Sequence, residues 1–105
     1  MIAREWIGET LASNADEYLR CLEETAVNHC RRTKGNKAVW ILRHIHEGKA
    51  RFVFLSRWDS LEPIKAFAGA EYEKAVYDPG DTKFLLYLDP HASHYEVLVS
   101  PDTGA

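Results

Sequence analysis

The 105-residue sequence lacks the features that mark fibrous, secreted or membrane proteins. It has two cysteines, four prolines and six glycines, too few for a disulfide scaffold, a collagen-like chain or a low-complexity segment. No apolar run is long enough to span a bilayer, and no N-terminal stretch combines the parts of a secretion signal. We therefore expect a cytoplasmic protein that has no membrane partner.

The charge balance argues against nucleic acid as a partner. The formal net charge is −3 at pH 7 and the pI is near 5.9. The densest basic run, residues 31–37, is short and interrupted, whereas binding to a phosphate backbone needs concentrated positive charge.

Several motifs that carry chemistry are also missing. The sequence has no G-x-S-x-G, Walker-type loop, G-x-G-x-x-G or H-E-x-x-H motif, so hydrolase, nucleotide-dependent and zinc-peptidase mechanisms have no support. His44 and His46 form H-x-H, and His91 and His94 form H-x-x-H. Because the spacing implies no third ligand for either pair, we expect no metal site.

Hydrophobic patterning predicts a small α+β domain. Alternating residues predict strands at 1–8, 37–46, 50–58 and 94–100, and the FLLYL segment at 84–88 fits either a strand or a helical turn. Helical spacing predicts one helix from about Ser13 to Lys34 and another from Asp59 or Ser60 to Val76, which Gly69 could bend or split.

The resulting order, β-α-β-β-α-β, is that of the ferredoxin-like fold, with both helices on one face of a four-stranded antiparallel sheet. One domain over residues 1–100, followed by a flexible tail at 101–105, accounts for the chain length.

The predicted strands are apolar on both sides. Val39 and Ile41 alternate with Trp40 and Leu42, and the last two strands show the same pattern. An antiparallel sheet with one solvated face should instead alternate apolar with polar residues. The face that the helices leave bare therefore predicts a homodimer through the sheet, which would resemble a β-barrel.

A basic residue stands among the aromatic residues of the predicted hairpin. If Gly48 and Lys49 form a two-residue turn, Arg43 pairs with Phe54, and its guanidinium would lie at the polar end of an apolar pocket between sheet and helices. The alternative is that Arg43 reaches the sheet edge and pairs with a surface carboxylate.

Three further side chains are candidates for the same pocket. His94 opens the last strand, where it could line the pocket or make a structural hydrogen bond. Tyr77 and Asp81 follow the second helix and could fold over the pocket, with the Tyr77 phenol donating to a ligand. Core packing is the alternative for Tyr77.

The segment FVFLSRWDSLEPIKAFAGAEYEKAVY at 52–77 resembles the antibiotic biosynthesis monooxygenase family of dimeric α+β barrels, in particular its small bacterial members. The motifs AREWIG at 3–8, WDS at 58–60, AFAG at 66–69 and HYEV at 94–97 support the resemblance over nearly the whole chain. The resemblance implies the ferredoxin-like fold and a dimeric α/β barrel.

Some members of that family oxidise aromatic polyketides or quinol-like molecules with dioxygen and no bound cofactor, and others bind or degrade haem. The resemblance thus implies a cofactor-independent monooxygenase that acts on a small aromatic, phenolic or quinol-like molecule. Arg43, Tyr77 and His94 are the candidate catalytic residues. The candidate pocket residues are Arg4, Trp6, Phe54, Ser56, Trp58, Phe67 and Asp81.

Two alternatives to this activity are a non-catalytic dimeric module, which binds a small molecule or serves a stress response, and a haem-binding protein. Haem degraders of the family carry a ligand histidine in the second helix segment. The corresponding residues 73–77 contain none, and Tyr77 is the nearest match.

Overall fold

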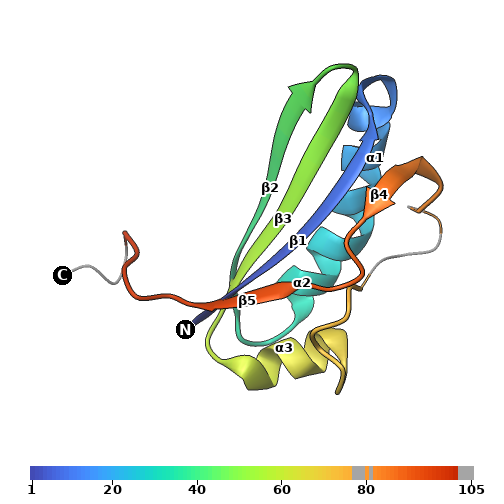
Figure 1. Cartoon of the computed structure of the whole chain (residues 1–105). Helices are drawn as coiled ribbons and strands as arrows, with labels where there is room; N and C mark the ends of the chain where they lie inside the picture. The colour runs from blue at the N-terminus through green and yellow to red at the C-terminus, as the bar shows by residue number, and fades with distance from the viewer. Residues whose placement is uncertain (77–79, 81, 102–105) are drawn as a thin grey trace.

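The computed structural model describes residues 1–76, 80 and 82–101. It contains one antiparallel sheet with helices on a single face (Figure 1). The elements in chain order are β1 (Ile2–Leu11), a 3₁₀ turn (Ala12–Asn14), α1 (Ala15–Leu22), a π-helical turn (Glu23–Val27), α2 (Asn28–Arg32), β2 (Asn36–His46), β3 (Lys49–Trp58), α3 (Leu61–Ala68), a 3₁₀ turn (Thr82–Phe84), β4 (Leu85–Leu88) and β5 (Ser93–Glu96).

The sheet has the ferredoxin-like order, with a divided edge. Its order is β2-β3-β1, and both β4 and β5 pair with β1 on the remaining side. The predicted α+β sheet is confirmed, and its fourth strand consists of two short pieces: β4 lies opposite residues 8–10 and β5 opposite residues 2–5. Pro90, which lacks an N–H group and so cannot donate to the ladder, lies in the break between them.

The last strand is shorter than its alternating sequence predicts. It ends at Glu96, and the Val97 N–H donates to the Met1 carbonyl at 3.0 Å. Of the predicted tail at 101–105, only Pro101 lies within the described residues.

The second helix is also shorter than predicted. It ends at Ala68, because Gly69 adopts a φ of +90° and its N–H donates to the Lys65 carbonyl at 2.7 Å. A positive φ at this position terminates a helix at little cost for glycine. The prediction of helix as far as Val76 is therefore wrong, and residues 70–76 run across to the loop between β4 and β5, where Lys74 forms a bridge with His91.

The first helical segment follows the prediction more closely. It runs from Ala12 to Arg32 with a π-helical turn in the middle. Its α-helical part is preceded by Asn14, which makes no side-chain capping hydrogen bond, so Ser13 is not the N-cap. No helix in the described part of the chain is long and apolar enough to cross a membrane.

The hairpin register differs from the prediction by two residues. Glu47 and Gly48 form the turn, with φ values of 51° and 78°, as a two-residue hairpin loop of the I′ kind requires. Arg43 consequently pairs with Phe52, Ile41 with Phe54 and Val39 with Ser56. Because the error is an even number of residues, each side chain still lies on the predicted face.

The helices and the sheet enclose one core. Alternate residues of β1 and β3 face the helices and are buried, and Tyr18 of α1 meets Phe52 edge to face at 5.0 Å between ring centroids. Trp58 and Phe67 pack at 5.4 Å in the same layer. Side chains therefore fill the space between the sheet and the helices in this region.

No helix or strand in the described part of the chain covers the other face of the sheet. Trp40 and Leu42 of β2 are 43% and 47% exposed, and Tyr95 of β5 is 50% exposed. Each of these residues alternates with residues that face the helices. In Figure 1 α1 and α2 lie along one side of the sheet and α3 lies at its lower end, so the described elements leave this face open.

Gly35 allows a close approach between the start of β2 and α3. A Cβ atom at Gly35 would lie 2.4 Å from Cγ of Pro63, whereas one at Gly48 would meet nothing within 4 Å; both glycines have positive φ. We expect Gly48→Ala to lower the free energy of unfolding by about 1 kcal/mol from backbone strain alone. Gly35→Ala should cost about 3 kcal/mol because overpacking against a rigid ring adds to that strain.

Urea unfolding of the wild type and both variants measures this difference. Equal losses in the two alanine variants would show that Gly35 is not required for the packing against Pro63.

Candidate functional site

Arg4 and His94 meet at the divided edge of the sheet. Arg4 in β1 lies directly opposite His94 in β5, so the two side chains emerge side by side on the helix-facing side. Nη1 of Arg4 is 3.0 Å from Nε2 of His94. Arg4 is only 4% exposed, which places a guanidinium group almost entirely out of water.

The segment after α3 supplies the remaining acceptors for Arg4. Nη1 donates to the Tyr72 carbonyl, and Nη2 donates to the Lys74 carbonyl at 3.2 Å. These carbonyl groups are available because the helix stops at Gly69; in a continuing helix they would accept from N–H groups four residues on. The Arg4 guanidinium also lies 5.7 Å from the centroid of the Phe67 ring, within cation–π range.

Burial lowers the pKa of Arg4 below its ordinary value, and the neighbouring Cys30 opposes this shift. The group stays protonated, since an arginine does not lose its proton in a protein. Burial also raises the pKa of the Cys30 thiol to about 12, against the effect of Arg4. Cys30 is therefore a neutral thiol that does not balance the charge of Arg4.

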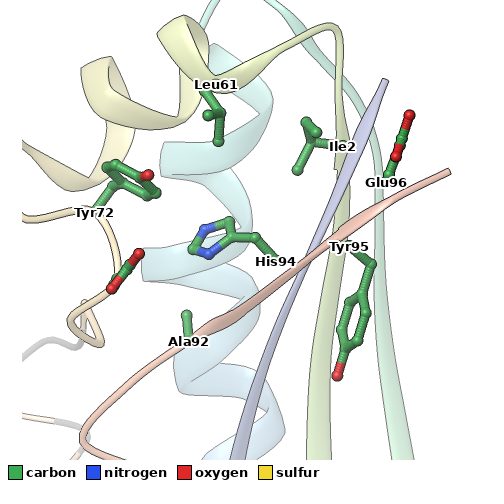
Figure 2. Close-up of a pocket in the computed structure, with 8 residues that line it drawn as sticks. Ile2, Leu61, Tyr72, Ala92, His94, Tyr95 and Glu96 are labelled. Carbon is green, nitrogen blue, oxygen red and sulfur yellow. The ribbon is translucent and has the colours of Figure 1, made fainter.

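A pocket of about 300 Å³ opens beside this cluster. The residues that line it are Ile2, Leu61, Tyr72, Glu73, Ala92, His94, Tyr95 and Glu96. Figure 2 shows the imidazole of His94 projecting into it toward Tyr72, while the Tyr95 ring points away to the other side of the strand. His94 and Tyr72 meet edge to face at 5.2 Å between ring centroids.

Backbone hydrogen bonds hold the walls of this pocket together. The Ala92 N–H donates to the Glu73 carbonyl at 2.8 Å, and the Ala75 N–H donates to the Pro90 carbonyl at 2.9 Å. The segment after α3 is thus fastened to the break between β4 and β5. The pocket combines an aromatic ring, an imidazole, two carboxylates and apolar side chains, which suits a small aromatic molecule that carries polar groups.

His94 is neutral under ordinary conditions. Burial and then the positive charge of Arg4 lower its pKa, and Glu73 partly opposes them. Since an unperturbed histidine titrates near pH 6.5, His94 carries no charge at neutral pH. A neutral imidazole has one donor and one acceptor nitrogen.

Comparisons with known proteins identify the fold. No family model matches the sequence, and no curated protein matches it. Among solved structures, a candidate antibiotic biosynthesis monooxygenase from Nitrosomonas europaea is 12% identical with a TM-score of 0.68, and the match covers 94% of this chain and 100% of that one. A candidate antibiotic biosynthesis monooxygenase from Bacillus cereus is 14% identical with a TM-score of 0.67, over 94% of each chain.

This chain has the antibiotic biosynthesis monooxygenase fold. A third structure with it is the haem degrader MhuD from Mycobacterium tuberculosis, which holds two haems in its active site; it is 16% identical with a TM-score of 0.63, over 95% of this chain and 98% of that one. At such low identities the likeness concerns the fold, and it confirms the fold that the sequence motifs implied.

Only some of the predicted site residues lie close together in the structure. Arg4 and His94 are in contact, and Phe67 lies under the guanidinium. Ser56 and Trp58 are fully buried in the core, where the Trp58 indole donates to the Ser56 hydroxyl at 2.8 Å. Trp6 and Phe54 are buried as well, and none of these four lines the pocket at His94.

Arg43 lies far from His94. Its guanidinium donates to Oδ1 of Asp16 at 2.8 Å on the exposed edge of the sheet, which is the alternative that the sequence left open. Three strand spacings and four residues along the strand separate it from His94, about 20 Å between Cα atoms. The placement of Arg43 in a pocket with His94 is therefore wrong. Tyr77 and Asp81 lie outside the described residues.

The sequence patterns do not identify several residues of the pocket, above all Tyr72 and Glu73, because they predict that the helix continues through both. The signal that could have found them is Gly69. A stop at this glycine frees the following residues to approach β5.

The other histidine pairs of the sequence lie in separate places. The rings of His44 and His46 lie 6.1 Å apart in a separate pocket of about 270 Å³ at the hairpin end. His91 lines another pocket, of about 280 Å³, beside Lys74. Within residues 1–76, 80 and 82–101, no group of three or more histidine, cysteine, aspartate or glutamate residues could hold a metal ion.

The lowered pKa of His94 predicts a pH dependence of stability. Its unfolded form binds a proton more readily than its folded form, so stability from the neutral ring is complete above about pH 6.5 and is lost as the pH falls through the folded pKa. We expect wild type to lose more unfolding free energy between pH 7.5 and pH 5 than His94→Gln, which does not titrate.

Urea unfolding at both pH values tests this, with His46→Gln at the exposed hairpin end as the control. A parallel loss in the wild type and His94→Gln would contradict the assigned pKa shift.

Proposed function

We propose that this chain is a cofactor-independent monooxygenase that oxidises a small phenolic or quinol-like molecule with dioxygen in the pocket at His94. The observation that carries the proposal is the presence of a neutral imidazole and a free carboxylate in one small, partly apolar pocket. The shared fold with antibiotic biosynthesis monooxygenases supports it.

The pocket residues match what such a reaction needs. A phenol reacts with dioxygen through its anion, so a base must take the hydroxyl proton and a donor must stabilise the oxygen that becomes charged. We assign Glu73 as the base and His94 as the donor. Ring contact with Tyr72 and apolar contact with Leu61 would orient the substrate.

The overall reaction balances without a bound cofactor. A methylene carbon that is activated by the phenolate loses two hydrogens and gains one oxygen atom, so that a carbonyl forms. The second oxygen atom of dioxygen leaves as water. The substrate supplies all four electrons that dioxygen takes up.

Oxygen consumption with a panel of anthrones, quinols and flavonoids tests this proposal. We expect turnover with at least one class. Glu73→Gln should reduce the rate about 100-fold, as removal of a general base typically does, whereas His46→Gln should leave it unchanged. Full activity in both Glu73→Gln and His94→Ala would refute the assignment of these residues. Binding of the panel without oxygen uptake would favour the non-catalytic binding module instead.

Haem binding has less support in the pocket, although MhuD holds haem on the same fold. His94 is the histidine that lines this pocket, and its Nε2 already lies 3.0 Å from a guanidinium group. A cation at that position competes with iron for the nitrogen lone pair. His94 therefore does not fit the role of an axial haem ligand here, and titration with hemin should give no Soret shift.

We further propose a homodimer through the open face of the sheet. Large side chains are half exposed there, and a second copy of the same face would cover them in a two-fold arrangement. The helices already cover the opposite face, so the open face is where apolar surface is still available.

Leu42→Glu tests the dimer. We expect wild type to sediment as a dimer and Leu42→Glu to shift to the monomer, because the dimer would bury an unpaired charge at each copy. Arg20→Glu on the exposed side of α1 serves as the control and should remain dimeric. A well-folded wild-type monomer in dilute solution would refute the proposal.

A further inference from the structure

Arg4 is a buried cation whose hydrogen-bond partners among the described residues are all neutral. It donates to two backbone carbonyls and contacts the imidazole of His94. None of the ion pairs that the structure describes involves Arg4, and the nearby Cys30 is a thiol. A charged group this deeply buried normally has an anionic partner. The positive charge at the back of the pocket is therefore not balanced by an ion pair among the residues that the structure describes.

The contact with Arg4 fixes which nitrogen of His94 carries the proton. A guanidinium group has only donors, so Nε2 of His94 must accept at 3.0 Å, and the hydrogen of the neutral ring is on Nδ1. A proton on Nε2 would direct one N–H group against another. The edge-to-face contact with Tyr72 limits rotation of the ring.

Nδ1 of His94 has no hydrogen-bond partner among the residues that the structure describes, since the imidazole's hydrogen bond there is the one to Arg4. The ring projects into the pocket (Figure 2). A ligand therefore meets an N–H donor, behind which lies a buried positive charge. The lone pair that a general base would need is already used by Arg4.

We propose that Arg4 and His94 together form a binding site for an anionic oxygen, with Nδ1–H of His94 donating to a phenolate and Arg4 as the positioning residue that holds this tautomer. The proposal rests on the proposed function and specifies the ionisation state in which the substrate is held. It makes His94 a donor and leaves the role of base to Glu73.

The carboxylates at the pocket are compatible with this site. Glu73 and Glu96 both line the pocket and are exposed to water. When a phenol enters, its proton moves to the Glu73 carboxylate, the O–H bond breaks, and the phenolate oxygen accepts the hydrogen bond from His94. The number of charges does not change in this step, because the negative charge moves from Glu73 to an oxygen that is nearer to Arg4.

Nuclear magnetic resonance of protein labelled with ¹⁵N-histidine tests the tautomer directly and without substrate. We expect His94 at pH 7 to show a protonated Nδ1 and an unprotonated Nε2. Arg4→Lys should keep this pattern because an ammonium group also only donates. Arg4→Met should release the ring to a mixture of tautomers, and Arg20→Met, an exposed arginine, should have no effect. A wild-type His94 that carries its proton on Nε2, or on both nitrogens, would overturn the proposal, even if Arg4→Met failed to fold.

Titration with 4-nitrophenol tests the anionic oxygen, because its phenolate absorbs visible light and its own pKa lies near neutrality. We expect wild type to bind the phenolate at least 10-fold more tightly than the phenol, and Arg4→Lys to retain part of this preference. 4-Nitroanisole, which cannot ionise, should bind no more tightly than the phenol. Binding of the protonated form, or no binding, would overturn the proposal.

The two proposals fail in different ways. If the tautomer and the phenolate preference are found but no phenolic substrate consumes oxygen, the anion site stands and the monooxygenase function is wrong. If oxygen is consumed while His94 carries its proton on Nε2, the function stands and the assignment of Arg4 and His94 is wrong.

Discussion

The burial of the Arg4 guanidinium, without a carboxylate partner in the described part of the chain, is the constraint on which this end of the molecule depends. A buried charge needs hydrogen-bond acceptors on all sides, and here they come from places far apart in the sequence. Tyr72 and Lys74 provide carbonyl groups, and His94 provides a ring nitrogen. The three segments must be held in place together, so the acceptor shell of Arg4 also fixes the walls of the pocket.

The pocket exists because two secondary structure elements stop early. Helix α3 ends at Gly69, and the edge strand is interrupted around Pro90. Each interruption leaves backbone N–H and carbonyl groups that need new hydrogen-bond partners. The groups of residues 73–75 bond to those of residues 90–92. The indole N–H of Trp6 donates a hydrogen bond to the Asp89 carbonyl, which also lies at the break, at 2.6 Å. These hydrogen bonds tie the irregular segments together at this edge, so that they can hold side chains in fixed positions.

The fold and the site carry different kinds of information about function. Proteins with this fold include candidate monooxygenases and a haem degrader, so the architecture alone does not select a reaction. We propose that the pocket distinguishes between them, because an imidazole that already accepts from a guanidinium is a poor ligand for iron and a good donor for a substrate oxygen. The open face of the sheet, where Trp40 and Leu42 are about half exposed, is a separate surface, and it is the one that we propose for the homodimer.

The sequence by itself determined the order of the elements, the faces of the strands and two members of the site. Alternation along a strand is a local property with a period of two, and it places Arg4 and Trp6 on one face. The two-residue error in the hairpin register does not change the face on which any side chain lies. His94 was chosen because it opens a strand. The tertiary structure decided that Arg43 pairs with Asp16 and that Tyr72 and Glu73 line the pocket. The first depends on which two residues adopt positive φ in the turn, and the second on where a helix stops at a glycine. Neither can be read from a local pattern, and contacts between residues up to 90 positions apart hold the segment after the helix in place.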